Sequence, residues 1–220
     1  MLKGLIFDFD GLMIDTEYTW YPIYKDYFIK HHDYEIEMDD FLTCIGSDDT
    51  YFMNLLQDAI GHTFDLKHFD TYRKDIFLEQ SRNLPMMRGV FELIQDAHAQ
   101  GLKLAIATSS KHPHALNHLK RWGIDHLFNV IITADDVAAV KPAPDLFLKA
   151  LNELKLNADQ VYIFEDSYHG LIAANKAGIE CIVVPNRVTI YSPFETQRLK
   201  LEHLGQTSIE ALKDLKNENK

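Results

Sequence analysis

The chain has 220 residues and a formal net charge of -11 at pH 7, with 46% hydrophobic and 25% charged residues. This composition is typical of a folded globular protein and argues against disorder, and the length is sufficient for one or two domains. An acidic surface repels phosphate backbones and anionic lipid headgroups, so we expect neither nucleic acid nor a membrane surface as a partner.

The first apolar run, Leu5–Phe7, is followed by a long stretch without a convincing strand. Between about residues 16 and 82 the apolar and aromatic positions recur at helical spacings, which predicts helices near 16–31, 48–60 and 66–81. This segment holds 14 acidic and 6 basic residues, so it carries most of the net negative charge. We therefore predict a separate helical domain at 16–82, inserted into a core domain formed by 1–15 and 83–220.

From residue 83 onwards, helical patterns alternate with short apolar runs. The predicted helices are Val90–Ala99, Ala115–Trp122, Pro144–Leu154 and Leu171–Ala177, and the predicted strands are Leu102–Ala107, Val130–Thr133, Val161–Phe164 and Cys181–Val184. Gly101, Gly123 and Gly178 follow three of these helices, where a left-handed cap residue is favoured. The alternation predicts an α/β fold with a doubly wound parallel sheet. A less regular tail begins near Arg187, with a last helix near Ser208–Leu215.

Polar residues follow the predicted strands, where ligands of an open parallel sheet bind. They are Asp8 and Asp10 after the first strand, Thr108, Ser109 and Ser110 after the second, Lys141 after the third, and Glu165 and Asp166 after the fourth. Crowded carboxylates repel one another unless a cation neutralises them. A ligand set of oxygens alone suits a hard ion such as Mg²⁺. The sequence therefore predicts a magnesium site that presents positive charge to a phosphoryl group.

The other strand-end residues suit phosphoryl transfer. Lys141 supplies a point charge and Thr108 a hydroxyl donor for phosphoryl oxygens. With the charge balanced in this way, one carboxylate can attack phosphorus and form an acyl phosphate. A second carboxylate, two residues along, can protonate the leaving oxygen and later activate water.

The segment Asp8-Phe-Asp-Gly-Leu-Met-Ile-Asp-Thr-Glu17 resembles the first motif of the haloacid dehalogenase (HAD) superfamily. The later motifs are similar to that family in the same order: Ala-Thr108-Ser-Ser, Lys141-Pro-Ala-Pro-Asp, and Phe-Glu165-Asp-Ser followed by Gly170. The resemblance covers essentially the whole chain. It is closest to the branch with a helical cap after the first motif, which includes β-phosphoglucomutase and many small-metabolite phosphatases. It implies a HAD-like Rossmannoid core with an inserted α-helical cap.

The resemblance also implies a role for each motif residue. Asp8 is implied to be the nucleophile and Asp10 the general acid/base, while Thr108, Ser109 and Lys141 hold the transferring phosphoryl group. The implied magnesium ligands are Asp8, the backbone carbonyl of Asp10, and Asp166, with Glu165 as an orienting or a direct ligand.

Family chemistry divides at a few positions. Haloacid dehalogenases and phosphonatases resemble this chain in the first motif, but they lack an Asp two positions after the nucleophile. The presence of Asp10 therefore disfavours both of these activities for this chain. β-Phosphoglucomutase resembles it at Asp15-Thr16 and Gly46, but has His in place of Trp20 and Arg near Asp48-Asp49. An acidic pair binds the second phosphate of a bisphosphate poorly. We therefore favour a phosphatase acting on a small phosphorylated metabolite, such as a sugar phosphate, with a phosphosugar mutase as the alternative.

The predicted cap is expected to set specificity. The candidate substrate-facing residues are Thr16, Glu17, Trp20 and the loop around Gly46. Trp20 either stacks on a sugar or base or packs inside the cap. Arg73 and Lys74 are further candidates for binding a second phosphate, although a solvated helix face is the simpler interpretation.

His112, His114 and His118 cluster after the second predicted strand, and the last two have a spacing that can bind zinc on a helix. Without an acidic or cysteine neighbour, they are better interpreted as a solvated helix start, with His112 near the mouth of the site. Cys44 and Cys181 lie in apolar stretches and are interpreted as small buried hydrophobes.

A different class of function is a phospho-accepting signalling module of the response-regulator kind. Such modules also combine an acidic cluster with Thr and Lys, but they are about half this length, accept phosphate after the third strand and lack a helical insert. A catalytically silent binding protein is disfavoured by the intact pair Asp8 and Asp10. The early acidic residues and the absence of a run of about 20 apolar residues predict a cytoplasmic protein, and we expect a monomer.

Overall fold

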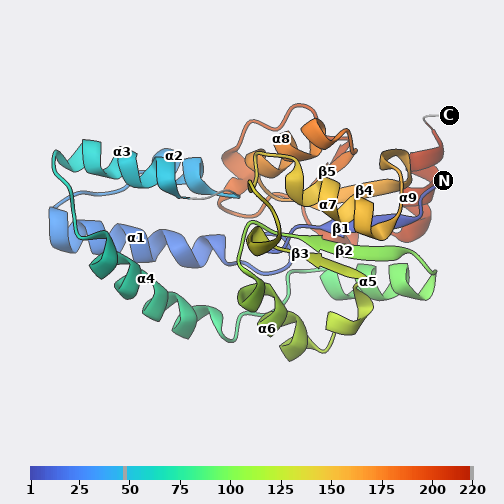
Figure 1. Ribbon diagram of the computed structural model, residues 1–220, viewed down its shortest axis with the longest axis horizontal. Coiled ribbons are helices and arrows are strands. Elements are labelled where there is room, and N and C mark those ends of the chain that lie inside the picture. Colours follow the sequence, from blue (N-terminus) through green and yellow to red (C-terminus); the bar gives the residue numbers. More distant parts are fainter. Residues whose placement is uncertain (47–48, 219–220) are drawn as a thin grey trace.

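The computed structural model describes residues 1–46 and 49–218 (Figure 1). Its six-stranded sheet is parallel and has the order β3-β2-β1-β4-β5-β6. The strands are β1 (Gly4–Phe7), β2 (Lys103–Ala107), β3 (Val130–Ile132), β4 (Val161–Glu165), β5 (Cys181–Val183) and β6 (Leu199–Lys200). The predicted doubly wound parallel sheet is confirmed. The two-residue strand β6 was not predicted, because so short a pairing leaves no apolar pattern.

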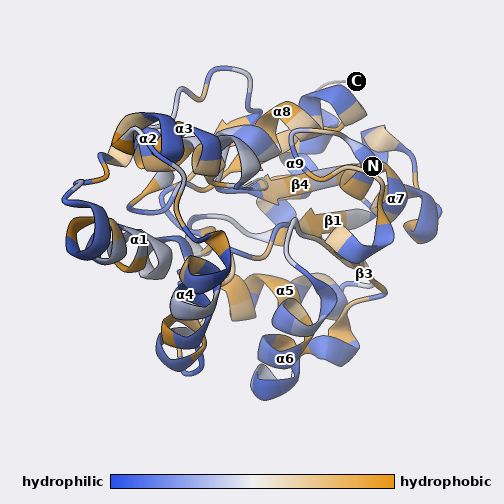
Figure 2. Ribbon diagram, turned by 60° about the vertical axis from the view of Figure 1, so that its left-hand side comes forward, coloured by the Kyte–Doolittle hydropathy of each residue, from blue (hydrophilic) through white to orange (hydrophobic). Residues whose placement is uncertain are grey.

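Strands β1 and β4 lie at the centre of the sheet, and every one of their residues is buried. They are largely hydrophobic along their length, whereas the surrounding helices show both polar and apolar residues (Figure 2). Phe7 of β1 pairs with Ile106 of β2 on one side and with Phe164 of β4 on the other. This register aligns the carboxyl ends of the three strands at the point where the strand order reverses, which is where ligands bind in such sheets.

Helices cover both faces of the sheet. One hydrophobic core joins the sheet to α5 (Val90–Ala99), α6 (His112–Trp122) and α9 (Ile209–Asn217), and a second core joins it to α7 (Asp145–Leu154) and α8 (Tyr168–Ala177). The predicted helices match these within three residues. Helices α6 and α8 begin earlier than predicted, because their first turns are polar and carry no apolar signal.

Four helices stand beyond the carboxyl ends of the strands (Figure 1): α1 (Glu17–His32), α2 (Met38–Phe41), α3 (Thr50–Ile60) and α4 (Leu66–Ser81). They share a separate hydrophobic core built largely from aromatic rings, among them Tyr24, Tyr27, Phe28 and Phe69. We refer to these four helices and their connections as the cap. The domain boundaries near residues 16 and 82 stay a prediction. No helix within the described ranges is long and apolar enough to cross a bilayer.

Candidate active site

The loop after β1 brings Asp8 close to the end of β4. Gly11 adopts a φ of +79°, and a Cβ atom there would lie 2.3 Å from Oδ2 of Asp166. Because only glycine has neither a Cβ atom nor a penalty at this φ, the loop can pass directly over Asp166. Asn186, after β5, donates from Nδ2 to Oδ2 of Asp166 at 2.8 Å and to the carbonyl oxygen of Gly11 at 3.1 Å. The acidic residues of the first and fourth strand ends are thus held together.

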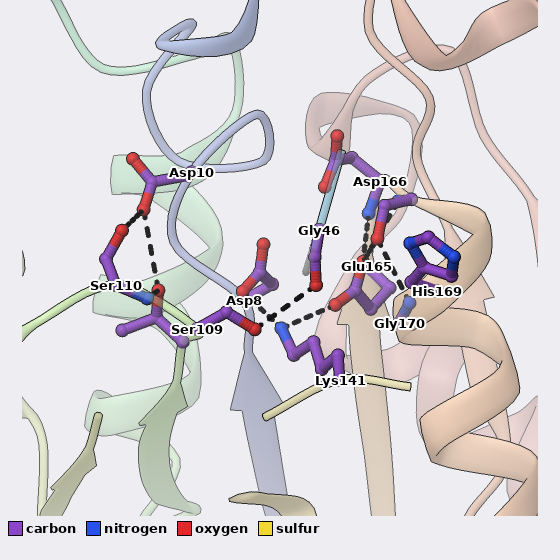
Figure 3. Close-up of polar contacts among 12 residues, drawn as sticks. Asp8, Asp10, Gly46, Ser109, Ser110, Lys141, Glu165, Asp166, His169 and Gly170 are labelled. Carbon is purple, nitrogen blue, oxygen red and sulfur yellow. Dashed lines mark hydrogen bonds and ion pairs between the residues drawn. The ribbon is translucent and has the colours of Figure 1, made fainter. Parts of the chain in front are cut away.

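Lys141 is buried between two carboxylates (Figure 3). Its Nζ atom donates to Oδ1 of Asp8 and, at 2.6 Å, to Oε1 of Glu165. Burial by itself lowers the pKa of a lysine, but the attraction of Asp8 and Glu165 raises the pKa of Lys141 above its ordinary value. The ammonium group is therefore charged, and it neutralises part of the acidic cluster.

Glu165 is held by the start of α8 as well as by Lys141. Its Oε2 atom accepts hydrogen bonds from the backbone N–H groups of Asp166 and Ser167 at 2.9 Å and from the Ser167 hydroxyl at 3.0 Å. Gly170 makes room for the carboxylate, because a Cβ atom there would lie 1.9 Å from Oε1 of Glu165. Both oxygens of Glu165 are engaged by the protein, which favours an orienting role over direct ligation of a metal.

Asp8 and Asp166 fit a hard divalent cation, with the carboxylate of Glu165 beside them. Asp8, Glu165 and Asp166 each offer one oxygen, these atoms lie within 4.8 Å of one another, and all three residues are buried. Burial, together with repulsion from Glu165, raises the pKa of Asp8 to about 8 against the attraction of Lys141. Burial and the neighbouring carboxylates also raise the pKa of Asp166 well above its ordinary value. Lys141 does not balance the charge of three carboxylates, and the cluster offers only oxygen donors. Such a site suits Mg²⁺ chemically.

Asp10 lies apart from this cluster, on the side of Ser110 (Figure 3). Its Oδ1 atom accepts a hydrogen bond from the Thr16 hydroxyl at 2.8 Å and lies 2.8 Å from Nε2 of His114. Its Oδ2 atom accepts hydrogen bonds from the hydroxyls of Ser110 at 2.6 Å and Thr108 at 3.4 Å. Burial opposes ionisation, but His114 and these hydrogen bonds lower the pKa of Asp10 below its ordinary range. The side chain is therefore a carboxylate in this arrangement.

A cavity of about 1420 Å³ lies between the cap and the sheet edge and contains both Asp8 and Asp10. From the cap it is lined by Glu17, Trp20, Tyr24, Gly46, Arg73, Lys74 and Phe77, and from the core by Thr108, Ser109, Lys111 and His114. The backbone carbonyl of Gly46 accepts a hydrogen bond from the Ser109 hydroxyl at 3.2 Å, which connects the cap to the core. The cavity is large enough for a small metabolite.

The predicted cap residues occupy different environments. Trp20 both lines the cavity and packs within the cap, where its ring stacks on Phe77 with centroids 3.8 Å apart. Glu17 is buried at the cavity wall, and burial raises the pKa of its carboxyl group well above the ordinary value. Thr16 is fully buried, binds Asp10 and does not line the cavity. It therefore lies behind Asp10, outside the lining of the cavity.

The interpretation of Arg73 as part of a solvated helix face is wrong. Only 14% of its side chain is exposed, and its guanidinium group contacts Asp49 and, at 2.5 Å, Asp70. The cap fold turns this face of α4 toward α1, which the spacing of charges within α4 did not reveal. Lys74, by contrast, is exposed. Asp48, the other member of the predicted acidic pair, lies outside the described residues.

The interpretation of the histidine cluster as a solvated helix start is also wrong for two of its members. His118 is buried, and His114 binds Asp10. They lie one turn apart on the face of α6 that packs against Phe9, in the loop after β1. His112 is exposed and is absent from the cavity lining, so its predicted place at the mouth of the site is not supported. The spacing of four residues between His114 and His118 does place them on one face of the helix, but that face packs against the loop after β1.

The structure adds three contacts to the predicted site: Ser110, which was placed at the second strand end without a role, His114 and Asn186. Ser110 stands within the motif after β2, so its position was a usable signal. Asn186 follows β5, so its position after the fifth strand was also a usable signal. His114 had no local signal pointing to Asp10, because the contact joins residues that are 104 positions apart.

Comparison with known proteins agrees with this architecture. A family model described as haloacid dehalogenase-like hydrolase matches residues 5–184. The chain is 34% identical over 215 residues to YhcW of Bacillus subtilis, covering 97% of each chain. It is 30% identical over 185 residues to the phosphorylated carbohydrates phosphatase of Thermotoga maritima, covering 82% of this chain and 84% of that protein.

A solved structure of CbbY from Rhodobacter sphaeroides in complex with phosphate has the same fold. Its TM-score is 0.79 at 24% identity, and the match covers 97% of this chain and 100% of that chain. Together with the family match over residues 5–184, the similarities span both the cap and the sheet. The chain belongs to the haloacid dehalogenase-like hydrolases.

Proposed function

We propose that this protein is a magnesium-dependent phosphatase that hydrolyses a small phosphorylated metabolite through an aspartyl-phosphate intermediate. One observation carries the proposal: Asp8, which lies in the buried acidic cluster with Asp166 and contacts Lys141, lines the same cavity as Asp10. The similarity to a protein named for phosphorylated carbohydrates supports phosphomonoesters, sugar phosphates among them, as the substrate class.

In the first half-reaction, a carboxylate oxygen of Asp8 attacks phosphorus and the bond between phosphorus and the leaving oxygen breaks. Asp10, which is a carboxylate in the structure, takes up a proton before this step and gives it to that leaving oxygen; in later turnovers this proton comes from the water of the second half-reaction. Lys141, Thr108 and Ser109 bind the oxygens of the transferring phosphoryl group. The product is phospho-Asp8 and a free alcohol.

In the second half-reaction, water attacks the phosphorus of phospho-Asp8 and gives a proton to Asp10. The bond between phosphorus and Asp8 breaks, inorganic phosphate leaves, and both carboxyl groups return to their starting states. Asp8, Asp166 and the backbone carbonyl of Asp10 would hold Mg²⁺, which supplies positive charge to the phosphoryl group when bound. Glu165 orients Lys141 through the 2.6 Å ion pair.

The contacts of Arg73 support a phosphatase over a phosphosugar mutase. A mutase must bind the second phosphate of a bisphosphate intermediate with cationic groups of the cap. Arg73 is already paired with Asp49 and Asp70, so its charge is largely neutralised. Water is therefore the better acceptor in this cavity than a phosphorylated sugar.

The test measures release of inorganic phosphate from a panel of phosphorylated metabolites, with and without Mg²⁺. We expect turnover that requires Mg²⁺ and is lost in Asp8→Asn and Asp10→Asn. Isomerisation of glucose phosphates that is much faster than phosphate release would favour the mutase. A stable phospho-Asp without turnover of any ester would favour the signalling class.

A further inference from the structure

The ring of His114 is held in one orientation by three neighbouring rings. Its centroid lies 5.7 Å from that of Phe9, 5.7 Å from that of Phe77 and 5.2 Å from that of His118. Phe9 belongs to the loop after β1, Phe77 to cap helix α4, and His118 to the next turn of α6. The orientation that these contacts impose places Nε2 2.8 Å from Oδ1 of Asp10.

The other contacts of Asp10 come from hydroxyl groups, which rotate about a single bond. Thr16 supports the same oxygen as His114, and Ser110 supports the other oxygen. An imidazole wedged between rings is a more rigid donor than a hydroxyl, because it cannot swing away without moving its neighbours. His114 is therefore the contact best able to restrict rotation of the Asp10 carboxyl group.

We propose that His114 is a positioning residue for Asp10 in the proton transfer to the leaving group. The inference rests on the proposed function, and it adds a residue on α6 to the acid/base machinery. His114 holds the Asp10 carboxyl group at the cavity wall in the orientation from which it meets the leaving oxygen. The proton itself passes from Asp10 to that oxygen.

The dependence on the leaving group separates this role from a general effect on the fold. An alkoxide is a poor leaving group and needs a proton as the bond to phosphorus breaks, whereas an aryl oxide leaves without one. The ratio kcat/KM reports the steps up to departure of the leaving group. A defect in the position of Asp10 therefore lowers kcat/KM for an alkyl ester and spares an aryl ester.

The experiment compares wild type, His114→Leu and His114→Gln on an alkyl phosphate and on 4-nitrophenyl phosphate, each with saturating Mg²⁺. His112→Ala is the matched control, since His112 is an exposed histidine in the same helix turn. For His114→Leu we expect kcat/KM on the alkyl ester to fall about 10- to 100-fold, the range for loss of a hydrogen bond to a charged group. The aryl ester should change less than about 3-fold.

His114→Gln places an amide donor near the position of Nε2, so we expect it to recover most of the lost activity. Equal losses on both esters, or a Gln variant as defective as the Leu variant, would overturn the inference while leaving the phosphatase proposal in place. A wild-type protein that hydrolyses neither ester would overturn both.

Discussion

Replacing Lys141 with Met tests whether the acidic cluster depends on this ammonium group for its charge balance. The side chain of Lys141 is 1% exposed and contacts Asp8 and Glu165, which are also buried. Methionine has a similar length but no charge, so Lys141→Met leaves the buried Glu165, and Asp8 to the extent that it is ionised, without their counterion. Breaking a buried pair in this way costs about 3–5 kcal/mol.

The assay is urea unfolding of wild type and Lys141→Met in the presence of EDTA at pH 8. We expect the free energy of unfolding to fall by about 3–5 kcal/mol, and the loss to be smaller with saturating Mg²⁺, because a cation bound to the folded state alone stabilises it. Lys149→Met is the matched control. Lys149 is a partly exposed residue of α7 whose Nζ atom lies 4.0 Å from Glu153 and donates to the carbonyl oxygen of Asp136, and such surface pairs contribute about 0–1 kcal/mol.

A loss below about 1 kcal/mol for Lys141→Met at pH 8 without metal would refute this reasoning, because it would equal the contribution of a surface pair. It would mean that the acidic cluster does not depend on Lys141 for its charge balance.

Three other predictions concern stability. The pKa of Asp8 is raised from 3.8 to about 8 in the folded protein, so between these values the folded state binds a proton that the unfolded state has released. The melting temperature without metal should therefore fall as pH rises from about 4 to 8, and Mg²⁺ should stabilise most at the upper end; a flat profile would contradict this. Gly11→Ala should lower the free energy of unfolding by about 1–3 kcal/mol, because its Cβ atom would lie 2.3 Å from Asp166 at a φ of +79°; urea unfolding measures it, and an unchanged midpoint would contradict it. Arg73→Met should lower the free energy of unfolding by about 1–2 kcal/mol, since it leaves the partly exposed Asp49 without its partner; a variant as stable as wild type would show that the pair contributes nothing.

The sequence by itself determined the fold class and most of the sheet edge. Leu5–Phe7 and Val161–Phe164 are continuous apolar runs, and such runs bounded by turns are strands buried on both faces wherever they occur. Once the strands are parallel, residues directly after them must share one edge. Asp8 and Asp166 were therefore predicted to lie close together, although 158 positions separate them, and the structure places their carboxylates together.

The tertiary structure alone decided which helix faces meet that edge. Strand burial is a local property of a few residues, but the partner of His114 depends on how α6 packs against the loop after β1. The neutralisation of Arg73 likewise depends on the arrangement of α3 and α4 in the cap, which brings Asp49, at the start of α3, to Arg73 from 24 positions away. Lys141 binds one oxygen of Glu165 and the backbone before α8 binds the other, so this contact depends on how these two segments are placed relative to each other. These contacts join segments whose relative positions follow from packing of the whole chain, so no local periodicity or spacing could reveal them.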